Sequence, residues 1–291
     1  MIGNLFALGA AVAWAAAVVL FKKSGEHFDA LGLNWFKSVV ALVLFALTVP
    51  LAGLAFLPGA PAAHVLLLLG SGVVGIAVAD TLFFRTLTLV GAARAAIVSC
   101  LYTPMVAVAS MLWLGETPTV KEIAGGLLVV SAVLLTQVQG ISRDLPPGAL
   151  PRGILLGALS MAANAGSVVA IKPILSTYPV VWSSGVRLVG GVVGLSLLAL
   201  ATASGRRAVA VFAPQRGWRV AIPAAAVGTY LSVMLWLAGF KYGPTNSAAV
   251  LNQTTTLFIV LLAAVFLHER FTPWHASATA LAFAGAAVIV W

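Results

Sequence analysis

Long apolar runs, separated by short segments that hold Gly, Pro or charge, extend from the first residues of the chain to the last. A helix needs about twenty mostly apolar residues to cross the hydrocarbon of a bilayer. Dividing the chain at charges and at Gly/Pro clusters predicts ten such helices. They are expected at residues 3–21, 31–49, 64–84, 92–114, 120–138, 153–171, 180–202, 219–240, 244–267 and 274–291. The pattern predicts an all-α integral membrane protein with ten transmembrane helices.

Composition agrees with this interpretation. Of the 291 residues, 62% are hydrophobic and 8% are charged, and the mean hydropathy is +1.09. A soluble core cannot bury that much apolar surface, so the bilayer must solvate most of the chain. The first apolar run is too long for a signal peptide and is interpreted as a retained span. Because the connecting segments are short, function is expected inside the helical bundle.

The formal charge of +9 comes from basic residues scattered singly or in pairs between apolar runs. They form no basic face, so a nucleic-acid partner is not expected, and contact with membrane lipid is the better interpretation. Cys100 is the one cysteine, and the chain contains no CxxC or HExxH motif. No metal or other cofactor is therefore expected.

The second half of the chain repeats features of the first. At an offset of 150 residues the paired positions are Gly3 with Gly153, Trp14 with Asn164, Lys22 with Lys172 and Lys37 with Arg187. At 152–153 residues they are Gly75 with Gly228 and Gly91 with Gly243, and residues 114–117 then match 267–270. Two five-helix units are predicted, at 1–138 and 153–291, joined by a linker at 139–152.

An odd number of spans in each unit has a geometric consequence. The second unit must enter the membrane from the opposite face, so the two units are inverted repeats around a central cavity. Inverted repeats allow two conformations of similar energy, each open to one side, which is the basis of alternating access. Both repeats lie in one chain, so a monomer would suffice.

The order and spacing of these features resemble the drug/metabolite transporter superfamily, and within it the ten-span exporters built from two EamA repeats. The segments that carry the resemblance are Ala13-Trp14, Lys37, 75–84, 91–96, Pro104 and 114–116, with Arg187, 243–249 and 267–270 in the second half. The resemblance implies a ten-helix basket and export of amino acids, including aromatic ones, or similar metabolites. This chain departs from the repeat at Asp80, where an aromatic residue is common, and at Asn164, where a second Trp is expected.

Polar residues in the middle of the fourth and ninth spans are the first candidates for substrate binding, because polar groups in lipid are costly and tend to face a cavity or one another. Pro104 frees a backbone carbonyl near Cys100. The candidates here are Ser99 and Tyr102 in the fourth span and Asn252, Gln253 and Thr255 in the ninth. The alternative is that these side chains only hydrogen-bond between helices.

Two further groups of candidates lie elsewhere in the bundle. Trp14, at mid-span, would stack on a substrate ring or a cation, and Asn164 lies at the equivalent position of the second unit. Tyr230 and Trp236 of the eighth span are weaker candidates. For the aromatic residues, core packing is the alternative.

Asp80 is the one carboxylate well inside a predicted span. It would bind a substrate ammonium group, exchange a proton, or form a structural ion pair. Lys37 and Arg187, placed near span ends, are its expected partners. Glu116 and Glu269 are expected to face lipid headgroups or to cap the following helix.

The chain is interpreted as a secondary transporter of the bacterial inner membrane that carries small metabolites, most plausibly amino acids, and not as an enzyme. The alternatives are a channel or lipid scramblase, or a lipid-modifying membrane enzyme. The enzyme interpretation lacks support because the four histidines are peripheral and have no evident catalytic partner. Basic residues concentrate in the loops on the side opposite the termini, which predicts that both termini lie outside the cytoplasm.

Overall fold

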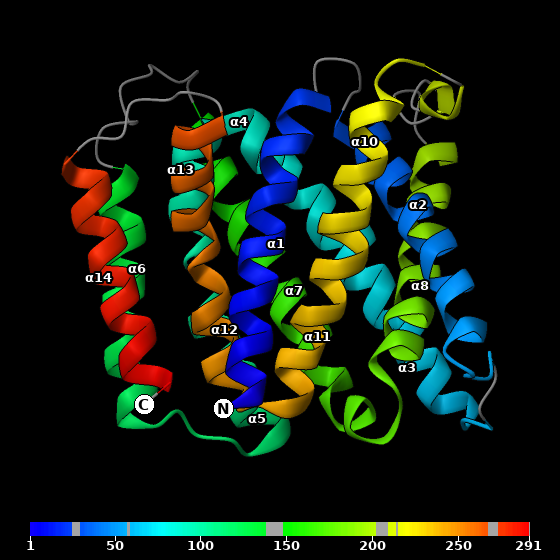
Figure 1. Ribbon diagram of the computed structural model, residues 1–291, viewed down its shortest axis with the longest axis horizontal. Helices are drawn as coiled ribbons and strands as arrows, with labels where there is room; N and C mark the ends of the chain where they lie inside the picture. Colours follow the sequence, from blue (N-terminus) through cyan, green and yellow to red (C-terminus); the bar gives the residue numbers. More distant parts are fainter. Residues whose placement is uncertain are drawn as a thin grey trace.

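The computed structural model describes residues 1–24, 30–56, 59–137, 148–201, 209–213, 215–266 and 273–290, and these are helical apart from short connections. The helices of the first half are α1 (Ile2–Ser24), α2 (Ala30–Leu51), α3 (Ala62–Gly72), the π-helical segment η1 (Val73–Ala79), α4 (Asp80–Ser99), α5 (Tyr102–Leu114) and α6 (Val120–Gln137). Figure 1 shows these helices standing side by side in one bundle with those of the second half.

The second half contributes α7 (Ala149–Thr177), α8 (Val180–Ala201), the short helix η3 (Val209–Phe212), α10 (Trp218–Ala225), the π-helical segment η4 (Ala226–Ser232), α11 (Val233–Tyr242), α12 (Thr245–Gln253), α13 (Thr255–Phe266) and α14 (Pro273–Val290). Helix therefore occupies each of the ten predicted spans. The segment 85–91, between the third and fourth predicted spans, is helical and belongs to α4. Neither Arg85 nor Gly91 stops a helix as proline does.

Within the described residues, six helical stretches are long and apolar enough to cross a membrane on their own: Ile2–Phe21, Leu31–Leu51, Ala62–Phe83, Ala149–Thr177, Val180–Ala201 and Trp218–Tyr242. Both fourth spans are interrupted near their middle, between Ser99 and Tyr102 in one unit and at Thr254 in the other. The interruptions divide these two spans into shorter helices.

The two units run in opposite directions. Gly3, at the start of α1, packs so closely on Gly243 that a Cβ at Gly3 would collide with its backbone. Lys172, near the end of α7, contacts Glu116 and Thr245 at the same face. So α1 begins at the face where α7 ends. Figure 1 places both chain termini at this face, hereafter the terminal face.

Close contacts between the units occur in pseudo-symmetric pairs. Gly3 of α1 packs on Gly243, and Gly153 of α7 packs on Val90. Gly153 is equivalent to Gly3 at an offset of 150 residues, and Gly243 is equivalent to Val90 at an offset of 153. Gly75 of η1 likewise packs on Ser167 of α7. The equivalent contact in the other half joins Gly228 to Ala17.

One hydrogen bond has a counterpart with its donor and acceptor exchanged between the units. Ser160 Oγ on α7 donates to the carbonyl of Ala79 at 2.7 Å, and Ser232 Oγ donates to the carbonyl of Ala10 on α1 at 3.1 Å. Ala10 and Ser160 are 150 residues apart, and Ala79 and Ser232 are 153 apart. The same joint therefore holds α1 to the second unit and α7 to the first.

The irregular backbone repeats at the same offset. The segments η1 and η4 each have seven residues and lie 153 positions apart. Leu101, before α5, and Thr254, after α12, are separated by the same number. π-Helical turns and broken membrane helices are frequent at functional sites. Irregular backbone therefore occurs at equivalent positions of both units.

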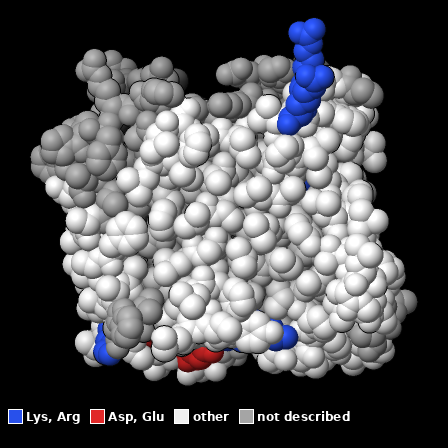
Figure 2. All heavy atoms as spheres, in the orientation of Figure 1, with Lys and Arg blue, Asp and Glu red and all other residues white. Residues whose placement is uncertain are grey.

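The outer surface suits a lipid environment. Figure 2 shows a face on which the visible charged side chains of the described residues lie near the upper and lower margins, with uncharged side chains between them. Exposed apolar residues on the helices include Val43, Leu127, Leu155 and Leu197. The bundle thus presents an apolar band to the bilayer.

Candidate functional site

A buried ion pair joins the second and third spans of the first unit. Lys37 Nζ of α2 lies 3.6 Å from an Asp80 carboxylate oxygen at the start of α4, and Lys37 is 5% exposed. The ammonium group also lies 5.7 Å from the centre of the Trp14 ring of α1. Lys37 is thus one of the two partners expected for Asp80, and Trp14 contacts this pair.

Arg187 of α8 lies in a second polar group between the units. Its Nε donates to Ser71 Oγ of α3 at 2.9 Å, and an Nη atom donates to Ser167 Oγ of α7 at 3.0 Å. Ser71 in turn donates to the backbone carbonyl of Ser167 at 2.6 Å. Arg187 is 3% exposed. Hydrogen bonds to two serines fix the guanidinium at the junction of three helices.

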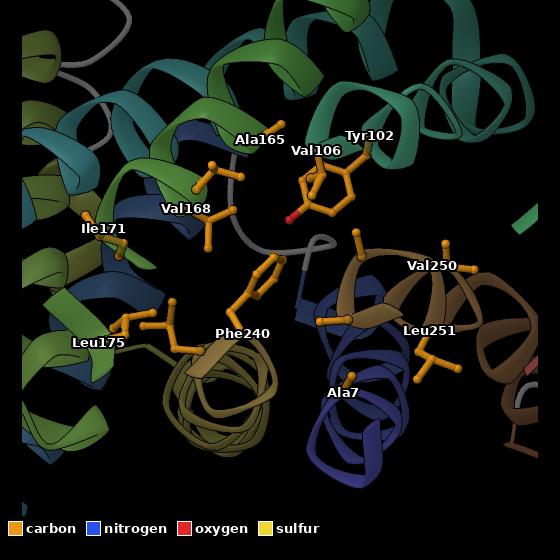
Figure 3. Close-up of a cluster of buried hydrophobic side chains, with 14 of the residues drawn as sticks. Ala7, Tyr102, Val106, Ala165, Val168, Ile171, Leu175, Phe240, Val250 and Leu251 are labelled. Atoms are coloured by element: carbon orange, nitrogen blue, oxygen red, sulfur yellow. The ribbon is translucent and has the colours of Figure 1, made fainter. Parts of the chain in front are cut away.

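Two aromatic residues bring unused polar atoms to Arg187. The Arg187 guanidinium lies 5.1 Å from the centre of the Trp236 ring of α11, and it interacts electrostatically with Tyr102 of α5. The indole Nε1 of Trp236 and the hydroxyl of Tyr102 are buried and interact with each other, but neither has a partner with full hydrogen-bond geometry. Figure 3 shows the Tyr102 hydroxyl directed away from its own helix, into the space bordered by Val168 and Phe240. Buried polar atoms without partners are rare, so these two mark a candidate site.

Asn164 of α7 adds an acceptor one helical turn from this group. Its Oδ1 is buried without a partner, while its backbone carbonyl accepts a bond from Ser167 Oγ at 2.8 Å. Thr103 Oγ1 of α5 is also buried without a partner. The sequence candidates Tyr102, Asn164 and Trp236 therefore all hold unused polar atoms.

The candidates of the ninth span lie at its helix break. Gln253 Nε2, at the end of α12, donates to the carbonyl of Ser99, at the end of α4, at 2.9 Å. Thr255 Oγ1 donates to the carbonyl of Asn252 at 2.7 Å within the same break. Of this polar run, Gln253 thus reaches the other unit, whereas Thr255 satisfies its own backbone.

Tyr230 has a different environment from the other candidates. Its hydroxyl lies 2.7 Å from Thr48 Oγ1 of α2, and its ring centre lies 4.6 Å from that of Phe45. These contacts hold η4 against α2. The structure therefore gives Tyr230 a packing partner and a hydrogen-bond partner, and leaves it outside the group around Arg187.

The terminal face is closed by a charged contact between the units. Lys172 Nζ donates to Glu116 Oε1 and to Thr245 Oγ1, both at 2.5 Å, and the Thr245 backbone N–H donates to Glu116 at 3.3 Å. Burial alone would raise the pKa of Glu116, but the hydrogen bonds from Lys172 and Thr245 outweigh burial and hold that pKa below its ordinary value. Glu116 therefore binds the second unit, instead of facing headgroups or capping the following helix as expected. Glu269 lies outside the described residues.

Glu122 closes the same face beside it. Its carboxylate accepts from the Thr119 N–H at 2.8 Å, and the Glu122 N–H donates back to Thr119 Oγ1 at 3.2 Å, which forms a capping box for α6. The other carboxylate oxygen accepts from the backbone and hydroxyl of Ser247 at 3.0 and 2.6 Å. Two carboxylates of the first unit thus satisfy free N–H groups at the start of α12.

Sequence reasoning placed Lys37 and Arg187 near span ends, but the structure buries both. It considered Arg187 only as a partner for Asp80 and did not propose it for substrate binding. Long basic side chains near helix ends usually reach the interface, which favoured the peripheral position. The 150-residue pairing of Lys37 with Arg187 was the signal that both belong to the centre. Within the described ranges, no group of three His, Cys, Asp or Glu side chains could hold a metal ion.

Two inverted helical units with a polar interior between them define the architecture of a membrane transporter. The sequence pattern of the EamA-like transporter family matches residues 1–138 and 151–291, and the chain belongs to this family of the drug/metabolite transporter superfamily. It is thus a multi-pass integral membrane protein of a transporter family and not of an enzyme family.

The fold has solved counterparts. One crystal structure, of a protein described without a function, is 17% identical and superposes with a TM-score of 0.80 over 98% of this chain and 95% of its own. This similarity shows the shared fold. No curated protein matches the chain.

Proposed function

We propose that the chain is a secondary transporter that exports small metabolites, most plausibly amino acids, by alternating access. The observation that carries the proposal is the group around Arg187, which takes Ser71 and Tyr102 from the first unit and Ser167 and Trp236 from the second. A site shared by two inverted units is reshaped whenever one unit tilts against the other. That coupling is what alternating access requires.

In this mechanism the described conformation is closed at the terminal face. Opening that face separates Glu116 from Lys172 and Ser247 from Glu122, because each pair joins one unit to the other. The Gly3–Gly243 contact must also part. Polar side chains and water at the surface replace the lost hydrogen bonds, so the cost of opening is moderate.

We propose that substrate lies among Trp14, Asp80, Tyr102, Asn164 and Trp236, with Ser99, Asn252, Gln253 and Thr255 bordering the helix breaks. Asp80 is the candidate for proton exchange, because it is a partly buried carboxylate with one close cationic partner. We also retain 1–138 and 153–291 as the two moving units and 139–152 as their linker. The bacterial inner membrane is the proposed location.

Counterflow in proteoliposomes tests the proposal. Liposomes with purified protein and an internal unlabelled amino acid should take up the labelled compound transiently above its equilibrium level, and uptake should saturate. A substrate panel containing aromatic, aliphatic and polar amino acids identifies the preferred class. Flux that rises linearly with concentration and is not reduced by competitors would favour a channel instead.

A lipid scramblase is the alternative from another class. It needs a polar path that opens to lipid. A crevice between α1, α13 and α14 is lined by Leu8, Thr254, Leu257, Phe258, Leu261, Ala282, Phe283 and Ala286. Its one hydroxyl, on Thr254, already donates to the Leu251 carbonyl at 2.6 Å. An apolar lining of this kind suits acyl chains and gives a lipid headgroup no hydrogen-bond partner. Liposomes that contain the protein should therefore move lipid between leaflets no faster than protein-free liposomes.

A further inference from the structure

The charges in the described centre do not balance. Lys37 is paired with Asp80. Arg187 forms no ion pair with a carboxylate among the described residues, and its electrostatic interaction with Asp80 acts over a longer distance. One positive charge is therefore left over in the interior of the bundle. A buried cation without a counter-ion is costly, and an anionic partner removes that cost.

The protein contacts of Arg187 are all neutral. Ser71 and Ser167 accept two of the five N–H donors of the guanidinium, and the Trp236 ring lies beside it. Gly75 leaves no room for a side chain here, because a Cβ would collide with the guanidinium. These contacts orient the group and leave donors available, while its charge remains uncompensated.

Two of the unpartnered atoms belong to residues that interact with Arg187, and both can donate. The indole N–H of Trp236 can only donate, and the Tyr102 hydroxyl is free to donate. A guanidinium fork, an indole N–H and a phenol together match a ligand that carries only acceptors. A carboxylate has about four lone-pair sites and accepts the fork of an arginine through two parallel bonds.

We propose that Arg187 binds the carboxylate of the transported molecule, assisted by the Trp236 indole and the Tyr102 hydroxyl. This inference rests on the proposed function, because it names the chemical group that the central site recognises. The unpartnered Oδ1 of Asn164, one turn along α7, then accepts from an N–H group of the same substrate. The substrate class is a carboxylate with a hydrogen-bond donor nearby, as in an amino acid.

The test compares four ligands on one scaffold: phenylalanine, 3-phenylpropionate, phenylalaninamide and phenethylamine. Binding is read from thermal unfolding with a thiol-reactive fluorophore, since the single cysteine, Cys100, is buried in the folded protein. With the wild-type chain, the two carboxylates should bind at least about tenfold more tightly than the amide and the amine.

Arg187→Gln should raise the Kd of the carboxylates at least about tenfold and leave that of the amide and amine unchanged. Arg187→Lys keeps the charge without the fork and should give an intermediate Kd. Arg152→Gln makes the same change at an exposed position of α7 and should change neither. If Arg187→Gln does not fold, Ser167→Ala supplies the comparison, because it removes one group that orients the guanidinium.

The outcomes separate this inference from the proposed function. An equal loss of affinity for all four ligands would make Arg187 a structural residue and overturn the inference. Saturable counterflow of a neutral or cationic compound, with carboxylates excluded, would leave transport standing and reject Arg187 as the anion site. Absence of any saturable counterflow would reject the proposed function, while the thermal assay alone would still decide whether carboxylates bind through Arg187.

Discussion

Gln253 donates a hydrogen bond of 2.9 Å from its side-chain amide to the backbone carbonyl of Ser99, and this bond joins the broken fourth helices of the two units. Ser99 is the last residue of α4, and Gln253 is the last residue of α12. Each break therefore depends on the other unit.

Gln253→Leu should destabilise the protein by about 0.5–1.5 kcal/mol, because it removes the hydrogen bond from the Gln253 amide to the Ser99 carbonyl. Transport should fall as well, since the break borders the proposed site. Chemical denaturation and counterflow measure the two effects. Gln215→Leu is the matched control at the surface, where water replaces the bonds of Gln215 to the backbone near Val211. Equal destabilisation by both changes would show that the Gln253–Ser99 hydrogen bond contributes no more to the free energy of unfolding than a bond at the surface.

Asp80→Asn should destabilise the protein by about 3–5 kcal/mol, because Lys37 is left buried without its counter-ion. The double variant Lys37→Met with Asp80→Leu should recover most of this loss, since no isolated charge remains. Thermal unfolding of Lys37→Met, Asp80→Leu and the double variant forms the cycle. Glu116→Gln breaks a more exposed pair and should cost less.

Asp80→Asn also tests the proposed proton exchange. If Asp80 carries a proton during transport, wild-type counterflow should respond to a pH gradient and the variant should not. Flux through the wild-type protein that ignores the gradient would contradict the proton role and favour facilitated diffusion.

Gly75→Ala should strongly reduce transport, because the added Cβ would press on the Arg187 guanidinium and on Ser167. Gly70→Ala is the control on the preceding helix, where an added Cβ meets nothing within 4 Å. Gly70→Ala should be neutral or slightly stabilising, since alanine favours helix. Equal activities of the two variants would mean that the guanidinium can shift without loss of function.

The contact between Glu116 and Lys172 should make stability depend on pH in acid. The folded-state pKa of Glu116 lies below its ordinary value of 4.5. The stabilisation is therefore complete above pH 4.5 and is lost as pH falls through the lower folded-state value. The thermal midpoint of wild type should decline over this range, and that of Glu116→Gln should decline less. Parallel curves would exclude Glu116 as the source.

A fusion at the C-terminus tests the predicted orientation. Because basic residues concentrate in the loops opposite the termini, both termini should lie outside the cytoplasm. A C-terminal phosphatase should then be active and a C-terminal GFP dark. Bright GFP with an inactive phosphatase would reverse the assignment.

The apolar runs predicted the helices well. A helix that crosses the bilayer needs a certain length and hydropathy, and both can be read directly from the sequence. The repeat and the family resemblance likewise came from residues such as Gly3 and Gly153. Hydropathy does not report which way a side chain points. Arg187 was therefore expected only near a span end, as a partner of Asp80, when it lies between helices on two serines. Glu116 was expected at headgroups or a helix cap when it binds Lys172. The π-helical segments left no signal, because their geometry depends on packing against the other unit.

The segments η1 and η4 give the bundle two places where a helix can change its winding. A π-helical stretch has more residues per turn than an α-helix, so rewinding seven residues as α would rotate the remainder of the span by roughly a third of a turn. Asp80 comes directly after η1, and Trp236 lies one turn after η4. A local rewinding would turn Asp80 away from Lys37, or the indole away from Arg187, while the part of the span before the π-helical segment kept its place. A change of winding inside one helix would then accompany the parting of the two units and remove a contact of the bound molecule at the same moment.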